Sequence, residues 1–326
     1  MTEVVNFQVF HKQSDKKGYL TMLSKYSAEI FGDILNKNSI LTDEMMKKHT
    51  TYKIGGACDV MLLPENEEQV VKIVKLCDEN KIPLFVVGNG SNLLVKDGGI
   101  RGVVMKIASK MSDIRVEGNH MYVQAGALLG SAVKTAYENS LSGLEFAIGI
   151  PGAVGGAVTM NAGAYGGHMQ QIVKKARVCD RSGNVTEICG DAFNFGYRQS
   201  VVRDKSLIVL SCELELEHSE RSQIKEKMDL LSAKRRSMQP LSLPSCGSVF
   251  KRPEGHYIGK LIEDAGLKGT TVGGAQVSTL HANFIVNVDN AKAKDVLDLI
   301  EVVKAKVLET FDIPIETEVI VIGEDQ

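Results

Sequence analysis

The sequence lacks the features that mark membrane-bound, secreted or nucleic-acid-binding proteins. No apolar stretch approaches the ~20 residues that a membrane-spanning helix needs. No apolar run follows a basic stretch at the N-terminus, as it would in a signal peptide. The formal net charge is -2, whereas a broad nucleic-acid surface requires a basic excess. We therefore expect a cytoplasmic protein that has neither a membrane nor a nucleic acid as its partner.

Metal-binding and disulfide motifs are missing too. The six cysteines form no CxxC pair, and none has zinc-ligand spacing to a histidine. We therefore expect reduced thiols and no bound metal. The chain has no internal repeat, and its 326 residues are enough for about two domains with a large buried core. Such a chain does not depend on a metal or a disulfide for stability.

The distribution of apolar residues predicts a mixed α+β fold, because strands and helices follow one another without the uniform alternation of a doubly wound parallel sheet. Residues 1–47 are expected to form an N-terminal extension with one or two surface helices near 19–35. The predicted strands are 59–63, 84–87, 103–107, 121–124, 172–179, 185–188, 206–216, 248–251, 283–288 and 319–322, and the predicted helices are 66–80, 128–140, 219–236, 258–265 and 291–310.

Glycine is concentrated in two segments, 88–92 and 149–167. Glycine loses the most backbone entropy on folding, and tight turns do not account for so many small residues in succession. Close approach of backbone amides to phosphate oxygens does account for them. Leu93 occupies the third glycine position of a dinucleotide fingerprint, and the chain has no P-loop. We infer that amides from several loops hold a dinucleotide.

Three motifs resemble, in order and spacing, those of the UDP-N-acetylenolpyruvoylglucosamine reductases of bacterial peptidoglycan synthesis. They are YKIGG at 52–56, VGNGSNLLV at 87–95 and the glycine-rich segment at 149–166. The resemblance begins near residue 48 and continues to the C-terminus. It implies an α+β protein with a two-lobed FAD-binding domain of the vanillyl-alcohol oxidase (PCMH) type at 48–218, followed by a smaller α+β substrate-binding domain at 219–326.

The resemblance also implies non-covalent FAD and NADPH as the hydride donor. In the family the glycine-rich loops hold the diphosphate of FAD, and the neighbouring segments follow the rest of the cofactor. The residues expected to contact FAD are Tyr52, Ile54, Gly55, Gly88, Asn89, Gly90, Ser91, Asn92, Leu93, Ala125, Gly126, Ile150, Pro151, Gly152, Val154, Gly155, Gly156, Asn161, Ala162 and Gly163.

Three polar residues in the second half of the chain are candidates for chemistry, although each also has an ordinary explanation. Arg198 could hold a carboxylate bidentately or form a surface salt bridge. Ser248 could be a positioned hydroxyl or a turn residue. Glu318 could lie in a cleft or at an exposed strand end. Cys246 has no motif of a cysteine nucleophile around it, so we favour an inert buried thiol.

The family pattern gathers these three residues into one catalytic site. Arg198 matches the arginine of the FGYRxS motif, Ser248 the serine of a small-Gly-Ser motif, and Glu318 the glutamate before the closing strand. The resemblance implies that Arg198 and Glu318 stabilise negative charge on the substrate carboxylate. It implies that Ser248 donates a proton to the reduced double bond.

The substrate implied is UDP-N-acetylglucosamine enolpyruvate, bound by a monomeric enzyme. By family position, Tyr197, Arg235, Lys260 and His281 are the expected substrate contacts. Arg252 stands where many relatives have asparagine, and the tyrosine-bearing loop of the longer subclass is absent, so other residues must close over the substrate. The alternatives are an oxidase of the same fold, a non-enzymatic nucleotide sensor and a cysteine hydrolase built on Cys246.

Overall fold

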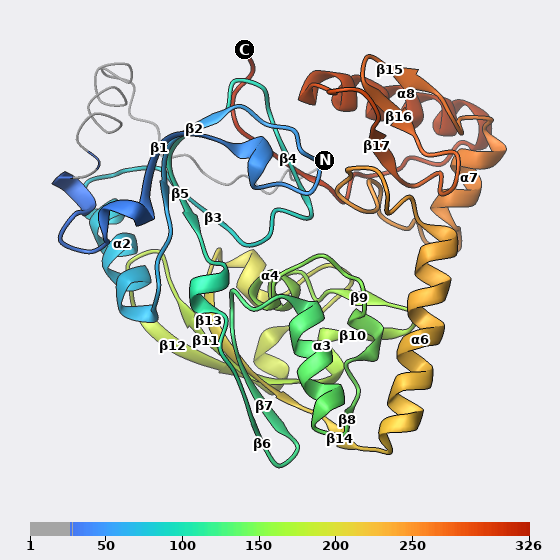
Figure 1. The fold of residues 1–326 in the computed structure, drawn as a ribbon. Coiled ribbons are helices and arrows are strands. Elements are labelled where there is room, and N and C mark those ends of the chain that lie inside the picture. The colour runs from blue at the N-terminus through green and yellow to red at the C-terminus, as the bar shows by residue number, and fades with distance from the viewer. Residues whose placement is uncertain (1–26, 28) are drawn as a thin grey trace.

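Three bodies make up the protein, and the computed structural model describes residues 27 and 29–326. Figure 1 shows a first lobe at the upper left, a second lobe below it and a C-terminal domain at the upper right. The long helix α6 (Arg221–Met238) runs along one side and joins the second lobe to the C-terminal domain. The expected α+β architecture is confirmed.

The first lobe is a four-stranded sheet in the order β1-β2-β5-β3. Its central strands are parallel, and β1 is antiparallel to β2. Helix α2 (Glu67–Glu79) begins at Asn66, whose side chain accepts a hydrogen bond from the Gln69 amide at 3.0 Å. It packs a buried stripe against the sheet, because its apolar residues recur at helical spacing. The strands are β1 (Ile40–Met45), β2 (Ala57–Leu62), β3 (Leu84–Val87) and β5 (Ile100–Lys106).

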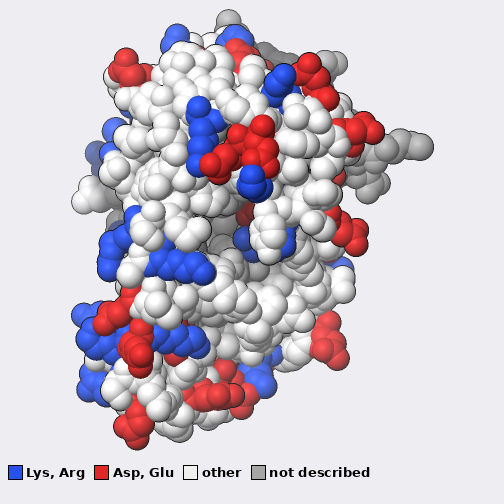
Figure 2. All heavy atoms as spheres, turned by 90° about the vertical axis from the view of Figure 1, so that its right-hand side faces the viewer, with Lys and Arg blue, Asp and Glu red and all other residues white. Residues whose placement is uncertain are grey.

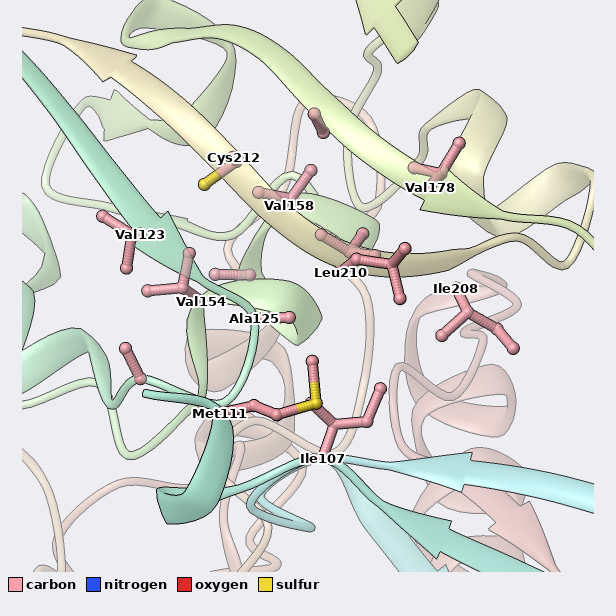
Figure 3. Packing of buried hydrophobic residues seen from close by; sticks show 14 of the residues in the cluster. Ile107, Met111, Val123, Ala125, Val154, Val158, Val178, Ile208, Leu210 and Cys212 are labelled. Atoms are coloured by element: carbon pink, nitrogen blue, oxygen red, sulfur yellow. The ribbon is translucent and has the colours of Figure 1, made fainter. Parts of the chain in front are cut away.

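The second lobe is a five-stranded antiparallel sheet in the order β12-β11-β13-β7-β6. Figure 3 shows Val158 of α4 beside Leu210 and Cys212 of β13, and all three are buried. The elements are β6 (Ile114–Glu117), β7 (His120–Gln124), β11 (Val173–Cys179), β12 (Val185–Cys189), β13 (Ile208–Glu215), α3 (Leu129–Glu138), α4 (Val154–Thr159) and α5 (Val201–Asp204). Two short two-stranded sheets, β9 with β10 (Gly163–Ala164, Gly167–His168) and β8 with β14 (Leu141–Ser142, Glu217–His218), extend this lobe.

In the C-terminal domain one helix packs against a three-stranded antiparallel sheet, and a second helix packs against the first. Helix α8 buries Val296, Ile300, Val303 and Val307, as its periodicity predicts. Leu297 and Leu308 were expected on the same face, but Leu297 is only partly buried and Leu308 is exposed. The elements are α7 (Ile258–Asp264), β15 (Thr271–Val272), β16 (Ala275–Val277), β17 (Ile285–Asn287) and α8 (Ala293–Phe311).

The C-terminal domain and the first lobe share structure. The last strand, β18 (Ile320–Ile322), pairs in parallel with β4 (Leu93–Val95), which directly follows the first glycine-rich loop. Tyr52, Ile54 and Leu94 belong to the same hydrophobic core as α7 and α8. Residues from both parts of the chain therefore meet where that loop ends.

The structure corrects two expectations. The N-terminal extension expected to end at residue 47 is wrong for its described part, because β1 belongs to the sheet of the first lobe, and Phe31 and Leu35 are buried in the core. The part of the expected helical region at 19–26 and 28 lies outside the described residues. The strand predicted at 248–251 is reduced to isolated bridges, Ser248 with Phe284 and Phe250 with Thr317, because the segment contacts two different partners in turn.

Within the described part of the chain, no helix combines the length and the apolar character needed to cross a bilayer. The same residues contain no cluster of three or more histidine, cysteine, aspartate or glutamate side chains that could hold a metal ion.

Candidate active site

A cleft of about 770 Å³ lies between the two lobes and reaches the segment 239–248. Most of the residues expected to contact FAD line it. These are Gly88, Asn89, Gly90, Ser91, Asn92, Leu93, Ala125, Ile150, Pro151, Gly152, Gly155, Gly156, Ala162 and Gly163. The two glycine-rich segments, which are far apart in the sequence, thus line one cleft and touch each other there, because the Asn89 side chain donates to the Pro151 carbonyl.

The remaining expected contacts lie behind the wall. The side chains of Tyr52 and Ile54 are buried in the core shared with the C-terminal domain, and the neighbouring Thr51 and Lys53 line the cleft instead. Gly55, Gly126, Val154 and Asn161 also do not line it. The side chain of Asn161 links two segments of the wall. Its Nδ2 donates to the Gly196 carbonyl at 3.0 Å, and its Oδ1 accepts from the Gln170 backbone amide at 2.9 Å.

The walls of the cleft suit a phosphate-bearing dinucleotide. Among the described residues, the backbone N–H groups of 88–92, Gly152 and Gly156 donate to no protein acceptor, so they are free to bind phosphate oxygens. A Cβ at Gly156 would meet no atom within 4 Å, which places this position against open space. Glycine at Gly90 is obligatory for the fold as well, because its φ is +63° and a Cβ would come within 2.2 Å of the His49 carbonyl oxygen.

Arg198, Ser248 and Glu318 come together at one end of this cleft. The Arg198 Nε donates to Glu318 Oε1 at 2.6 Å, and its Nη2 donates to the Gly163 carbonyl at 3.4 Å. The Glu318 amide donates to the Val249 carbonyl at 2.7 Å, which fixes Glu318 beside Ser248. The hydroxyl of Ser248 has no hydrogen-bond partner among the described residues, so it is available to a ligand.

The same three side chains also line a second, smaller hollow of about 490 Å³ on the C-terminal domain. Tyr197, Lys260 and His281, three of the four expected substrate contacts, lie in it. Burial lowers the pKa of the His281 imidazole, so the ring is neutral at neutral pH. Its Nδ1 is buried and has no hydrogen-bond partner in the described part of the chain. Arg198, Ser248 and Glu318, which we call the reactive trio, therefore lie at the junction of the larger cleft and the smaller hollow.

Arg252 and Tyr257 form an aromatic and cationic wall of the smaller hollow. The guanidinium of Arg252 lies 4.1 Å from the centre of the Tyr257 ring, and its Nε donates to the His256 carbonyl at 3.2 Å. The Arg252 amide donates to the Tyr197 hydroxyl at 3.4 Å. Figure 2 shows a hollow on this face of the molecule with lysine and arginine side chains on either side of it.

Arg235, the fourth expected substrate contact, lies in the larger cleft rather than the smaller hollow. It projects from α6 against Gly149, where a Cβ would come within 2.7 Å of the Arg235 Cδ. Its Nη1 donates to Gln239 Oε1 at 3.0 Å, and its guanidinium lies 5.6 Å from the centre of the Tyr165 ring. Burial lowers the pKa of this arginine, and its Nε has no hydrogen-bond partner among residues 27 and 29–326.

The structure also decides against a cysteine nucleophile at Cys246. Burial raises the pKa of its thiol to about 12, so the thiol stays protonated at neutral pH, and only a thiolate is an effective nucleophile.

Lys53 belongs to the segment 52–56 that was expected to follow the cofactor, and it lines the larger cleft with a φ of 55°. Arg181 and Leu241 also line this cleft and were not expected from the sequence. Arg181 and Leu241 sit in loops without a motif, and only the folded chain brings them to the cleft.

Comparison with known proteins identifies the family. Residues 58–188 match the model of an FAD binding domain, and residues 239–322 match that of the C-terminal domain of UDP-N-acetylenolpyruvoylglucosamine reductase. The chain is 49% identical over 297 residues to the UDP-N-acetylenolpyruvoylglucosamine reductase of Clostridium perfringens, covering 91% of this chain and 97% of that one. It is 50% identical over 295 residues to that of Clostridium botulinum, covering 90% and 96%.

The match to the first relative extends further toward the N-terminus than the motifs suggest. A match of 297 residues in a chain of 326 leaves at most 29 outside, so it reaches into residues 1–47, in agreement with the place of β1 in the first sheet. The two family models leave 189–238 between them, and the domain boundary expected near 219 stays a prediction.

A solved structure shows the same architecture. The crystal structure of UDP-N-acetylenolpyruvylglucosamine reductase from Thermus caldophilus superposes with a TM-score of 0.75 at 36% identity, covering 85% of this chain and 97% of that one. The glycine-lined cleft, the matched FAD binding domain and this close overall similarity agree with one another. The chain belongs to the UDP-N-acetylenolpyruvoylglucosamine reductase family and is an FAD-dependent oxidoreductase.

Proposed function

We propose that this chain reduces the enolpyruvyl group of UDP-N-acetylglucosamine enolpyruvate to give UDP-N-acetylmuramate, with NADPH as the electron donor, in peptidoglycan precursor synthesis. The observation that carries the proposal is the position of Arg198, Ser248 and Glu318. They stand where a glycine-lined cleft meets a hollow with cationic and aromatic walls.

The larger cleft is proposed to hold FAD, with its diphosphate against the free amides of 88–92, Gly152 and Gly156. When bound, FAD supplies the hydride that reduces the double bond, having received it from NADPH. The protein contributes the position of the substrate, a proton and compensation for the charge that develops during the reaction.

Arg198 and Glu318 are proposed to hold the carboxylate end of the substrate. The bond from Arg198 Nε to Glu318 fixes the guanidinium and leaves Nη1, which has no partner among the described residues, to donate to a carboxylate. A preorganised cation at this point stabilises the negative charge that moves toward the carboxylate as the hydride arrives at the terminal carbon of the double bond.

Ser248 is proposed to donate the proton that completes the reduction. The hydride adds to the terminal carbon of the enolpyruvyl group, and the proton adds to the carbon that bears the carboxylate. The Ser248 hydroxyl has no hydrogen-bond partner within the described residues and lies beside Glu318, which suits proton delivery at that point. A positioned proton donor contributes about 10²–10⁴-fold in rate.

The smaller hollow is proposed to receive the uridine diphosphate of the substrate. Phosphates suit the cationic wall, and a nucleobase suits the exposed tyrosines. Because the substrate is a soluble nucleotide sugar, we further propose that the chain works in the cytoplasm. We propose that it works as a monomer, because both hollows are formed by one chain. A mass measurement in solution tests the second point.

The first test is an anaerobic visible spectrum of the purified protein, recorded before and after NADPH and again after the substrate. A yellow protein that NADPH bleaches and the substrate recolours establishes both half-reactions. A protein that bleaches but is recoloured only by oxygen would indicate an oxidase. A colourless protein that cannot be reconstituted with FAD would overturn the proposal.

The second test separates the role of Ser248 from binding. In Ser248→Ala, we expect reduction by NADPH to proceed at nearly the wild-type rate, while reoxidation by substrate slows by about 10²–10⁴-fold. Stopped-flow absorbance measures the two half-reactions separately, and the NADPH half-reaction serves as the internal control. Equal slowing of both steps would exclude a proton-donor role for this serine.

A further inference from the structure

Arg181 is a positively charged residue of the larger cleft, and neither a sequence motif nor the proposed reaction gives it a role. It lies in the tight turn between β11 and β12 and lines the larger cleft. Among the described residues it forms no ion pair. The carboxylate of Asp180 beside it accepts instead from the amides of Ser182 and Asn184, at 2.8 and 2.9 Å. The guanidinium therefore has no compensating charge within the part of the chain that the structure describes.

Two backbone carbonyls hold the Arg181 side chain in place. Its Nε donates to the Ser206 carbonyl at 3.0 Å, and its Nη1 donates to the Leu84 carbonyl at 3.2 Å. Ser206 precedes β13 in the second lobe, and Leu84 begins β3 in the first. Arg181 thus connects the two lobes. Burial, chiefly, lowers the pKa of its guanidinium, but an arginine remains charged at neutral pH.

Part of the guanidinium remains free for a ligand. Its Nη2 donates to no acceptor among the described residues. This nitrogen is nevertheless not enclosed by the protein. The free N–H groups therefore face accessible space, and the accessible space beside Arg181 is the cleft. A cation without a counter-charge that donates into a ligand cleft favours a ligand with acceptor atoms or an aromatic face.

Hydrogen bonds fix the order of the residues along the cleft. Arg181 contacts Leu84 at the beginning of β3, and the loop 88–92 follows the end of that strand. At the far side of this loop, the Asn92 amide nitrogen donates to the Glu318 carbonyl at 3.2 Å. Arg181 and the reactive trio thus lie on opposite sides of the loop. Four residues of extended strand, about 13 Å, separate Arg181 from the loop.

Between Arg181 and the loop, the cleft is lined by the edge of a sheet. Strand β3 is the last in its sheet among the described residues, so its outer edge is free there, and Phe85, Val86 and Val87 line the cleft. A free strand edge offers N–H and C=O groups side by side. This pattern matches the acceptor and donor on the pairing edge of adenine.

We propose that Arg181 binds the adenosine end of FAD and makes the cleft selective for FAD over flavin mononucleotide. The inference rests on the proposed function in taking FAD as the occupant. With the diphosphate on the loop 88–92 and the flavin ring beside Glu318, the adenosine extends along β3 to Arg181. Its guanidinium stacks on the base or donates to its ring nitrogens.

The test measures ligand binding by the apoprotein and needs no catalytic turnover. Dissociation constants for FAD, flavin mononucleotide and ADP are determined by equilibrium dialysis for the wild type, Arg181→Gln and Arg181→Lys. Arg177→Gln is the matched control, because Arg177 lies on β11 too but is exposed and pairs with Glu67 at 3.1 Å, outside the cleft. A melting curve of each apoprotein reports any loss of the connection between the lobes.

We expect Arg181→Gln to weaken FAD and ADP by tenfold or more, since a charged hydrogen bond is lost, while flavin mononucleotide changes less than twofold. Arg181→Lys retains only part of the affinity, and Arg177→Gln matches the wild type. Equal weakening of FAD and flavin mononucleotide would show a merely structural role and overturn the inference, as would unchanged FAD binding. If the wild type itself binds no FAD, the proposed function fails as well.

Discussion

The backbone of Arg198 adopts a left-handed conformation, with a φ of 56°. For a residue with a Cβ this costs roughly 1–2 kcal/mol, so the surroundings must enforce it. The tight turn between Gly196 and Gln199 does so, together with the bond from Arg203 Nη1 to the Arg198 carbonyl at 2.7 Å. Strain of this kind is concentrated at functional sites, and here it directs the guanidinium toward Glu318.

Tyr257 is expected to bind the substrate and not the cofactor. Its side chain is 69% exposed, and it lines only the smaller hollow. We expect Tyr257→Ala to raise KM for the substrate by about tenfold, because a base-stacking contact contributes ~1–3 kcal/mol. FAD affinity and the rate of reduction by NADPH should stay at wild-type values.

Steady-state kinetics checks this prediction, and Tyr257→Phe is its control. The phenyl ring keeps the stacking surface, so this variant should retain most of the wild-type KM. A similar KM increase in both variants would instead implicate the hydroxyl group, and an unchanged KM in Tyr257→Ala would place the nucleotide elsewhere.

His49 is expected to make the stability of the protein depend on pH. Its Nε2 lies 2.9 Å from Glu44 Oε1, and its Nδ1 lies 3.0 Å from Lys106 Nζ. Burial, followed by the charges of Lys106 and Lys48, lowers the pKa of the imidazole below its usual 6.5, against the opposing effect of Glu44. The unfolded chain therefore binds a proton that the native protein does not.

The free energy of unfolding should consequently decrease as the pH falls below about 6.5, the value for the unfolded chain. In His49→Gln the decrease between pH 7 and 5.5 should be smaller. Urea unfolding at a series of pH values measures this, and the window stays above the usual pKa of glutamate. Parallel curves for the two proteins would show that His49 does not contribute.

Individual site residues could be predicted only where a motif named them. Arg198, Ser248 and Glu318 were found in this way, and the structure brings them together, although their catalytic roles remain proposals. Arg181 lies in a turn whose sequence resembles any other turn. Its importance arises from Leu84 and Ser206, which are distant in the sequence.

At the scale of the element, the two glycines in the first turn of α4 have separable purposes. A Cβ at Gly155 would come within 2.8 Å of the Ala125 Cβ, whereas a Cβ at Gly156 would meet no atom within 4 Å. We expect Gly155→Ala to lower the melting temperature of the apoprotein. Gly156→Ala should leave the melting temperature unchanged or raise it slightly, since alanine favours the helix.

For the affinity of the cofactor we expect the opposite order, with the larger effect from the substitution at Gly156. The methyl group of Gly156→Ala projects into the cleft and removes space that the cofactor needs, so FAD affinity should fall in spite of the intact fold. Thermal melting and FAD titration of both variants check the pair. Wild-type FAD affinity in Gly156→Ala would mean that the cofactor does not approach this turn.

Helices were predicted more accurately than strands, for a physical reason. Helix α8 has a continuous apolar stripe, and its bounds follow from the stripe within a few residues. Strand β1 has two exposed residues in its middle and partly buried ends, so no alternation marks it. The segment 248–251 has apolar residues at strand spacing, yet it bonds with two partners in turn and forms no continuous ladder.

At the scale of the molecule, we expect the two domains to unfold in a single transition. The core around Tyr52 includes residues of the first lobe and of α7 and α8, and β18 pairs with β4 of the first lobe. Calorimetry should show one peak whose calorimetric and van't Hoff enthalpies agree. Two separate peaks would mean that the shared core does not couple the domains.

Tyr52→Ala tests the same coupling. The side chain is completely buried, and deletion of a large buried ring costs about 3–5 kcal/mol. The single transition should move to lower temperature as a whole, without splitting. Leu308→Ala is the control, because this leucine is 47% exposed on α8, so its removal should change stability by less than about 0.5 kcal/mol.

The pairing of β18 with β4 has a consequence for recombination between genes. A flavin-binding unit that ended before residue 320 would leave one edge of β4 without its partner and would lose Glu318 as well. An exchange of the C-terminal domain with that of another flavoenzyme therefore succeeds only if the incoming domain brings its own returning strand. We therefore expect the C-terminal domain and the flavin-binding part of the chain to be inherited as a pair.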